Sequence, residues 1–236
     1  MVNEKKARTI LNERSFKFLV TNKKKSKIIL KTLNKLYPKV LTPLNYKNNF
    51  TLLISVLLSA QCTDVNVNNV TKKIYPKYNK PAHFVKLGKK KIEKLIKRIG
   101  IFRIKAKSIF NLSKILLHKH KGKVPNTYEE LEKLPGVGHK TASVVMSQGF
   151  GFPAFPVDTH IHRLAQRWGL TNGKNVVQTE KDLKAIFPKK SWNRLHLQII
   201  WYGREYCKAR DCFGISCKIC KSCYPNRKRK IKTKKA

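Results

Sequence analysis

Leu134-Pro135-Gly136-Val137-Gly138-His139-Lys140-Thr141-Ala142 is the stretch of the sequence that decides the fold. Thr127 and Glu130 before it form a capping-box pattern, which opens a short helix over residues 127–134. A second helix follows the turn, and two helices joined by a glycine-rich turn are typical of a helix-hairpin-helix. Glycines let another backbone approach closely, and the free N–H groups at the start of the second helix can bind a phosphate. Gly136 and Gly138 are therefore predicted to contact a nucleic-acid backbone without reading its sequence.

Two other interpretations of this stretch are weaker. The glycines alone also fit an ordinary tight turn, but the longer Pro-Gly-Val-Gly-x-Lys-Thr-Ala string favours the helix-hairpin-helix. A Walker phosphate loop needs a lysine directly after its last glycine and a strand before the loop. Here His139 separates Gly138 from Lys140 and no strand pattern precedes the turn, so that motif is excluded.

Outward from this turn, apolar residues recur at helical spacing along most of the chain. The breaks between these segments are short and contain Gly or Pro. No segment of useful length alternates with period two, so the predicted fold class is all-α. The expected helices begin at Lys27, at Phe50 and at Asp64, and then cover 81–87, 89–99, 103–119, 127–134, 139–149, 158–168, 176–187 and 191–206.

The charge of the chain is strongly one-sided. Among 236 residues there are 53 Lys and Arg against 12 Asp and Glu, which gives a net charge of +41. A field of that sign favours a polyanionic partner, and nucleic acid comes first. However, 42 of the 53 cations are Lys, and Ile and Asn are abundant too, which is a pattern that drift in base composition also produces. Charge alone does not separate an enzyme that acts on nucleic acid from a ribosomal protein.

The sequence predicts that the protein lies in a compartment where cysteine thiols stay reduced. The longest apolar run, residues 50–60, has the length of a core helix rather than of a membrane span, and the N-terminus lacks an apolar signal region. We therefore expect a cytoplasmic protein without a membrane partner. Its cysteines are then thiols or metal ligands rather than disulfides.

Lys140 and Asp158 are the candidate catalytic residues. Lys140 follows the glycine turn at a helix start, which disfavours an ammonium charge, and an unprotonated lysine amine can form a Schiff base with a sugar carbon. Only four Asp occur in the chain, and Asp158 could simply cap the helix that follows it. It could also stabilise the positive charge that builds on a sugar when an N-glycosidic bond breaks. One residue can do both.

Three motifs together make the chain resemble endonuclease III, a family of bifunctional DNA glycosylases and abasic-site lyases in the helix-hairpin-helix superfamily. They are Leu57-Leu58-Ser59-Ala60-Gln61-Cys62-Thr63-Asp64, the lysine turn that begins at Leu134, and Val157-Asp158-Thr159-His160. The similarity runs from about residue 27 to 223. It implies that an oxidised pyrimidine is flipped out of duplex DNA, that Lys140 attacks C1′ with Asp158 as the catalytic aspartate, and that β-elimination nicks the strand 3′ to the abasic site.

The resemblance also assigns DNA contacts. Gln61 matches the glutamine that fills the space left by the flipped base, and Ile101 stands where the family inserts a leucine wedge. Ile101 could equally be an ordinary surface residue. His139 replaces the usual arginine of the family, which is expected to weaken a DNA contact without changing the chemistry. Cys62 stands where alanine is common and is interpreted as a small core residue.

Five of the six cysteines lie between residues 207 and 223, which indicates a metal site. Zinc sites usually use two separate Cys-x-x-Cys pairs, whereas iron–sulfur clusters accept four thiolates from one stretch. The resemblance implies a [4Fe-4S] cluster, but this chain departs from the family spacing Cys-x6-Cys-x2-Cys-x5-Cys. The ligands that we expect are Cys207, Cys217, Cys220 and Cys223, with Cys212 as the competing ligand.

The protein is expected to be a monomer, and its chain is expected to have four parts. A basic N-terminal extension covers residues 1–26, an iron–sulfur domain combines 27–47 with 158–223, a six-helix domain covers 48–157 with the helix-hairpin-helix at 127–149, and a basic tail covers 224–236. A DNA-binding groove is expected between the two helical domains. The predicted partner is double-stranded DNA with a damaged pyrimidine or an abasic site, in a bacterial cytoplasm with the enzyme associated with the nucleoid.

Three alternative functions fit the sequence less well. A monofunctional adenine glycosylase lacks a lysine at the position of Lys140. A non-catalytic nucleic-acid-binding module needs neither Lys140 nor Asp158. A zinc-stabilised RNA-binding protein would contain zinc in place of iron.

Overall fold

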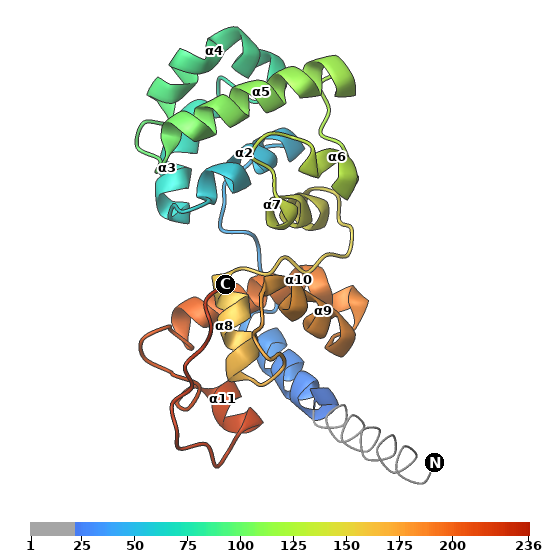
Figure 1. The fold of residues 1–236 in the computed structure, drawn as a ribbon, viewed down its shortest axis with the longest axis vertical. Coiled ribbons are helices and arrows are strands. Elements are labelled where there is room, and N and C mark those ends of the chain that lie inside the picture. Colours follow the sequence, from blue (N-terminus) through green and yellow to red (C-terminus); the bar gives the residue numbers. More distant parts are fainter. Residues whose placement is uncertain (1–21) are drawn as a thin grey trace, which may run out of the picture. The chain divides into compact units, whose positions relative to one another are not determined.

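The computed structural model describes residues 22–236, and over that range it contains helices and no strand (Figure 1). The predicted all-α class is therefore confirmed for the described part of the chain. Residues 1–21 of the expected basic N-terminal extension lie outside the described residues. No helix between residues 22 and 236 is both long and apolar enough to cross a lipid bilayer.

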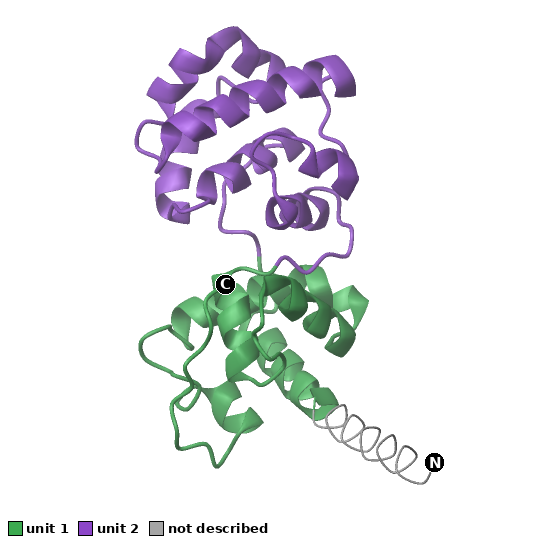
Figure 2. Ribbon diagram, viewed as in Figure 1, with its two compact units in different colours: residues 1–40, 157–236 green, residues 41–156 purple. Residues whose placement is uncertain are grey.

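The chain forms two compact units, coloured separately in Figure 2. One unit consists of residues 41–156, and the other combines the described residues up to 40 with residues 157–236. The first unit contains α2 (Asn49–Ser59), α3 (Asp64–Ile74), α4 (Pro81–Leu95), α5 (Phe102–His120), α6 (Tyr128–Glu132), α7 (His139–Val144) and the π-helical turn η1 (Val145–Gly149). The second contains a helical segment over 22–36, then α8 (Thr159–Arg167), α9 (Val176–Ile186), the 3-10 turn η2 (Lys189–Ser191), α10 (Trp192–Glu205) and α11 (Lys218–Cys223).

Helix α2 is the centre of the core of unit 41–156. Nine consecutive residues, Phe50 to Leu58, are buried, because this helix is apolar on every face. Its start is fixed by a reciprocal capping box: the Asn48 side chain accepts from Thr51 N, and the Thr51 hydroxyl accepts from Asn48 N, each at 2.9 Å. The one buried polar group near its middle, the Ser55 hydroxyl, is paired with Tyr75 at 2.6 Å.

Helix α4 is bent at Gly88, where φ is +71° and ψ is 158°. The sequence pattern predicts a break at this residue between 81–87 and 89–99. A positive φ favours glycine, so the residue type and the bend agree. The second half ends at Leu95, four residues earlier than predicted, and residues 96–101 form the loop before α5.

The termini of the second unit are more ordered than the sequence suggests. Residues 22–26, assigned to the basic extension, are helical, and Lys25 donates to the Tyr224 hydroxyl at 2.7 Å. The tail also packs on its own unit. Arg227 donates to the carbonyls of Arg167 and Gly214, and Ile231 N donates to Phe213 O at 2.9 Å. Hydrogen bonds within the unit therefore hold Lys25 and Arg227, whereas the lysines of the tail remain exposed.

Candidate active site and cysteine cluster

The glycine turn before Lys140 has the geometry of a type II turn. Val137 N donates to Leu134 O at 3.0 Å, and the two central residues are Pro135 and Gly136, with a φ of +80° at Gly136. A Cβ atom on Gly136 would lie 2.9 Å from the Cβ and hydroxyl oxygen of Ser108. Glycine is required here twice, for the left-handed backbone and for the close approach of α5.

Gly138 and Lys140 have a different environment. Gly138 is the N-cap of α7 with φ −97°, and a Cβ there would meet nothing within 4 Å. It has no side chain to cap the helix, so the start of α7 stays open to a ligand. The Lys140 side chain is exposed in the first turn of α7, and no hydrogen bond or ion pair within the described chain holds its amine.

His139 is held by the first helix of the hairpin. Its Nδ1 lies 2.8 Å from a carboxylate oxygen of Glu132, and its ring stacks on Tyr128 with 5.4 Å between centroids. The capping box predicted for this helix is only half present. Thr127 Oγ1 accepts from Glu130 N at 3.3 Å, but its hydroxyl donates to the Glu130 carboxylate at 3.2 Å. Helix α6 ends at Glu132 rather than at the predicted residue 134.

Asp158 is the N-cap of α8 and is half-buried. Its Oδ1 accepts from Ile161 N at 2.8 Å, so the capping interpretation is correct. The cap uses one of the two carboxylate oxygens, which leaves a second acceptor on the same residue. Lys140 belongs to unit 41–156, and Asp158 belongs to the other unit.

Gln61 and Ile101 share an unusual backbone conformation. Cys62 N donates to Ser59 O at 3.1 Å across a turn in which Ala60 has φ −58° and ψ 119° and Gln61 has φ +54°. Ile101 has φ +49° and is 50% exposed. Cys62 is half-buried against the core of its unit, which agrees with its interpretation as a packing residue.

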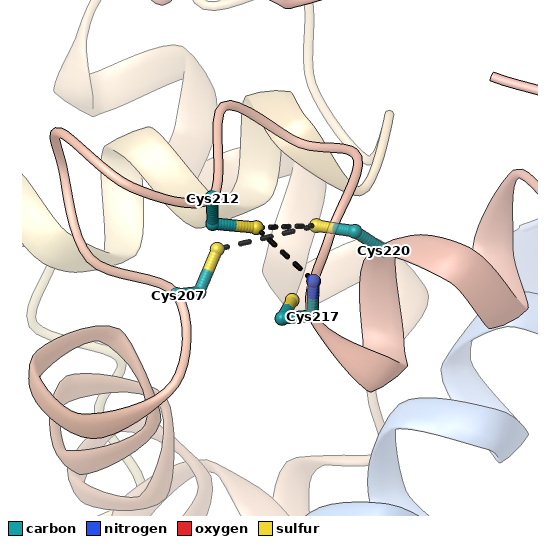
Figure 3. A group of neighbouring side chains, drawn as sticks. All are labelled: Cys207, Cys212, Cys217 and Cys220. Carbon is teal, nitrogen blue, oxygen red and sulfur yellow. Dashed lines mark hydrogen bonds between the residues drawn. The ribbon is translucent and has the colours of Figure 1, made fainter. Parts of the chain in front are cut away.

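Four cysteine side chains converge in the loop between α10 and α11 (Figure 3). The sulfur atoms of this cysteine cluster all lie within 4.8 Å of one another, and they belong to Cys207, Cys212, Cys217 and Cys220. Cys220 Sγ lies 4.0 Å from Cys207 Sγ and 3.8 Å from Cys212 Sγ. The donor set of four buried thiols fits an iron–sulfur cluster or zinc.

The cluster differs from the expected ligand set in one residue. Cys212, the competing candidate, is in the cluster, and Cys223 is not. Cys217 is the N-cap of α11 and Cys220 lies in its first turn, whereas Cys223 is its last residue. The convergence of the sulfur atoms distinguishes Cys212 from Cys223, and the pKa of the thiols does not. Hydrogen bonds with neighbouring thiols, that with Cys207 first, lower the pKa of Cys212 but raise the pKa of Cys220, which is also in the cluster.

Arg167 is a functional residue that the sequence pattern did not reveal. Its guanidinium is buried beside the cluster and donates to Cys207 Sγ at 3.4 Å, to Lys208 O at 2.8 Å and to Ala209 O at 2.8 Å. A fixed cation favours thiolates, and its fork of donors ties down the loop. One arginine of eleven has no signal in the sequence that marks it, because the loop path is set by tertiary structure.

Comparisons with known proteins identify the family of this chain. The model of the HhH-GPD superfamily of base excision DNA repair proteins matches residues 54–189. Endonuclease III of Bacillus subtilis (strain 168) is 40% identical over 209 residues, which cover 88% of this chain and 95% of that protein. Endonuclease III of Escherichia coli (strain K12) is 45% identical over 189 residues, covering 80% and 90%. The chain belongs to the endonuclease III family.

A solved structure agrees with this assignment. A trapped endonuclease III–DNA covalent intermediate superimposes with a TM-score of 0.78 at 40% identity, covering 85% of this chain and 97% of that chain. The family prediction from the three motifs is therefore confirmed. Endonuclease III enzymes are DNA glycosylases and abasic-site lyases of base excision repair, and this chain is one of them.

Proposed function

We propose that this endonuclease III removes oxidised pyrimidines from duplex DNA and nicks the strand 3′ to the abasic site, with Lys140 as the nucleophile. The observation that supports this role is the exposed Lys140 amine, which has no partner in the described chain and follows the Gly136–Gly138 turn directly. An amine without a carboxylate partner is available to attack. Other exposed lysines of the chain share this availability, and the position directly after the turn distinguishes Lys140 from them.

The proposed reaction has two steps. First, the Lys140 amine forms a bond to C1′, and the base leaves with the electron pair of the glycosidic bond and takes up a proton. The ring then opens to a Schiff base between C1′ and the amine. Second, loss of a 2′ proton moves an electron pair toward the Schiff base, and the C3′–O bond breaks with the phosphate as leaving group. No oxidant or reductant is consumed in either step.

Asp158 is proposed as the carboxylate partner of this reaction. Its capping bond to Ile161 N fixes the side chain by one oxygen, which leaves the other to stabilise positive charge on the sugar. Because asparagine also caps helices, Asp158→Asn should retain the cap and lose the charge. This substitution separates the two roles that the sequence leaves combined.

The remaining DNA contacts are also proposals. The Gly136–Gly138 turn and His139 would contact phosphates at the open start of α7, and Gln61 and Ile101 would fill the space left by the flipped nucleotide. His139 already bonds Glu132 at 2.8 Å, so it is a weaker phosphate donor than the arginine that it replaces. We also propose that the enzyme works as a monomer on bacterial nucleoid DNA, since one chain carries both Lys140 and Asp158.

We propose a [4Fe-4S] cluster bound by Cys207, Cys212, Cys217 and Cys220. The four converging thiols and the family support it, and when bound the cluster would supply covalent cross-links that fix the loop. One tetrahedral zinc ion is the alternative for the same donors. Iron and sulfide analysis of Cys212→Ser and Cys223→Ser tests the ligand set. Cluster loss is expected only in Cys212→Ser, and loss only in Cys223→Ser, or zinc without iron, would contradict the proposal.

Borohydride trapping tests the role of Lys140. The wild-type protein should form a covalent complex with duplex DNA that contains an abasic site or thymine glycol, and Lys140→Ala should form none. Lys133→Ala is a matched control, because Lys133 is an exposed lysine of the same motif that pairs only with Glu129. Undiminished trapping by Lys140→Ala would exclude this residue as the nucleophile.

A further inference from the structure

Gln61 and Ile101 both hold a backbone conformation that their residue types disfavour. The turn around Gln61 is of type II, which needs a positive φ at its third residue and is normally filled by Gly or Asn. Ile101 is β-branched, for which a φ of +49° is a true outlier. A left-handed backbone is energetically unfavourable for both residue types. Something in the surrounding structure must hold both conformations.

Lys105 on α5 supports the turn that leads into Gln61. Its side chain is only 3% exposed, and its amine donates to Leu58 O at 2.9 Å and to Ala60 O at 2.5 Å. These carbonyls lie at the end of α2, and that of Ala60 belongs to the peptide that joins it to Gln61. The side chain of Lys105 therefore fixes the peptide before Gln61. Its backbone N–H donates to Ile101 O at 3.2 Å, which is the ordinary first bond of α5 and needs no lysine.

Asn66 on α3 supplies a second connection between the two loops. Its side-chain amide donates to Arg98 O at 2.9 Å and lies 3.2 Å from Cys62 Sγ. The loops also touch directly, because a Cβ on Gly100 would lie 3.4 Å from Gln61 O. Gln61 and Ile101, forty residues apart in sequence, therefore lie on two adjoining loops.

Burial of a lysine without an acidic partner is itself unfavourable. Desolvation lowers the pKa of Lys105, and in the described chain its amine has carbonyl oxygens as hydrogen-bond acceptors rather than a carboxylate. Most of the residues buried in this unit are uncharged, and methionine has a similar length without the charge. A role beyond packing explains why a cation occupies the position.

We propose that Lys105 and Asn66 are positioning residues. Lys105 holds the turn that keeps Gln61 left-handed, and Asn66 ties this turn to the loop that ends at Ile101, so that both side chains are ready to enter the DNA duplex. The inference rests on the proposed insertion of Gln61 and Ile101 into DNA. Lys105 does not contact the reacting sugar in this proposal. Its positioning role affects only substrates in which a base is displaced from the stack and the space that it leaves is filled.

Duplex and single-stranded abasic DNA distinguish this role from a general one. Both substrates need the chemistry of Lys140, but only the duplex has an opposite strand and a stacked space to fill. We expect Lys105→Met and Asn66→Ala each to lower kcat/KM on duplex abasic DNA by about tenfold, the size of one missing hydrogen bond. Borohydride trapping and cleavage of the single strand should change less than about twofold, because neither depends on that hydrogen bond.

The control is Lys107→Met, which removes an exposed lysine from the same helix. It should leave the ratio of duplex to single-strand activity as in the wild type. An unchanged ratio in folded Lys105→Met and Asn66→Ala, checked by their melting temperatures, overturns the proposal. An equal loss on both substrates also overturns it, because it indicates a purely structural role. If Lys105→Met does not fold, Asn66→Ala decides alone. Failure of the proposed Lys140 chemistry is a separate result, since the wild type would then trap neither substrate.

Discussion

At the scale of single residues, the two glycines of the lysine turn have different functions. Gly136 has a φ of +80° and no room for a Cβ, whereas Gly138 has a φ of −97° and open space around it. Only Gly136 is therefore demanded by the fold. The fold does not require glycine at position 138. Its value is access, because an N-cap without a side chain leaves the N–H groups of α7 open to a phosphate.

Gly136→Ala should destabilise the protein by about 2–4 kcal/mol, from the left-handed backbone and the overlap with Ser108. Gly138→Ala is the matched control and should change stability by less than about 1 kcal/mol. Denaturant unfolding of both variants measures the difference. Equal stabilities would show that α5 moves away from the turn at little energetic expense.

A buried histidine makes the second unit sensitive to acid. His162 Nδ1 lies 2.8 Å from the Thr179 hydroxyl, and burial lowers the pKa of His162 below its ordinary 6.5. The unfolded chain then takes up the proton at a higher pH than the folded chain, so stability falls as the pH falls below about 6.5. His162→Gln should lose less stability than the wild type between about pH 7 and 5. Exposed His118→Gln should behave as the wild type, and equal acid sensitivity of all three proteins would contradict this role.

At the scale of elements, the helices were predictable and the cysteine loop was not. The apolar periodicity that predicts α2 to α10 is a local property, and even the bend at Gly88 is marked by its residue type. Helix α11 was missed, because six residues with two lysines and two cysteines have no apolar face to detect. Choosing Cys212 over Cys223 depends on how the loop folds back, which spacing does not specify. The left-handed Gln61 and Ile101 contradict their own propensities, so tertiary contacts alone explain them.

Arg167 connects α8 to the cysteine loop, and its geometry as well as its charge should matter. Arg167→Lys keeps the charge but loses the fork that reaches Cys207, Lys208 and Ala209. Loss of such supporting bonds lowers metal affinity by about 10–100-fold, so the variant should release its metal to a chelator correspondingly faster. Arg210→Lys, an exposed change in the same loop, is the control. If both variants release metal at the same rate, Arg167 does not support the metal site.

At the scale of the whole molecule, the question is whether the charge of +41 serves DNA binding or reflects composition. The basic tail can answer this question, because the tail is docked on its own unit. Lys234 N donates to Gln166 Oε1 at 2.8 Å, and Gln166 Nε2 donates to Lys234 O at 3.1 Å. Gln166 lies in the last turn of α8, the helix whose N-cap is the proposed catalytic Asp158. The tail is therefore docked on the same helix that Asp158 caps, at its other end.

Neutralising the tail should weaken DNA binding in a way that salt reveals. The substitutions Lys228→Gln, Lys232→Gln and Lys235→Gln change exposed side chains and leave the backbone hydrogen bonds of the tail intact. Removing one cation from a phosphate lowers the slope of log K against log salt by about 0.9, so we expect the triple variant to lower it by roughly 1–3. A charge-matched triple variant on α4, at Lys86, Lys90 and Lys91, should leave the slope unchanged, because that helix carries none of the proposed DNA-binding residues. If the two variants have the same slope as the wild type, the tail charge is a product of composition. If both lower it equally, the whole surface binds DNA without a preferred path.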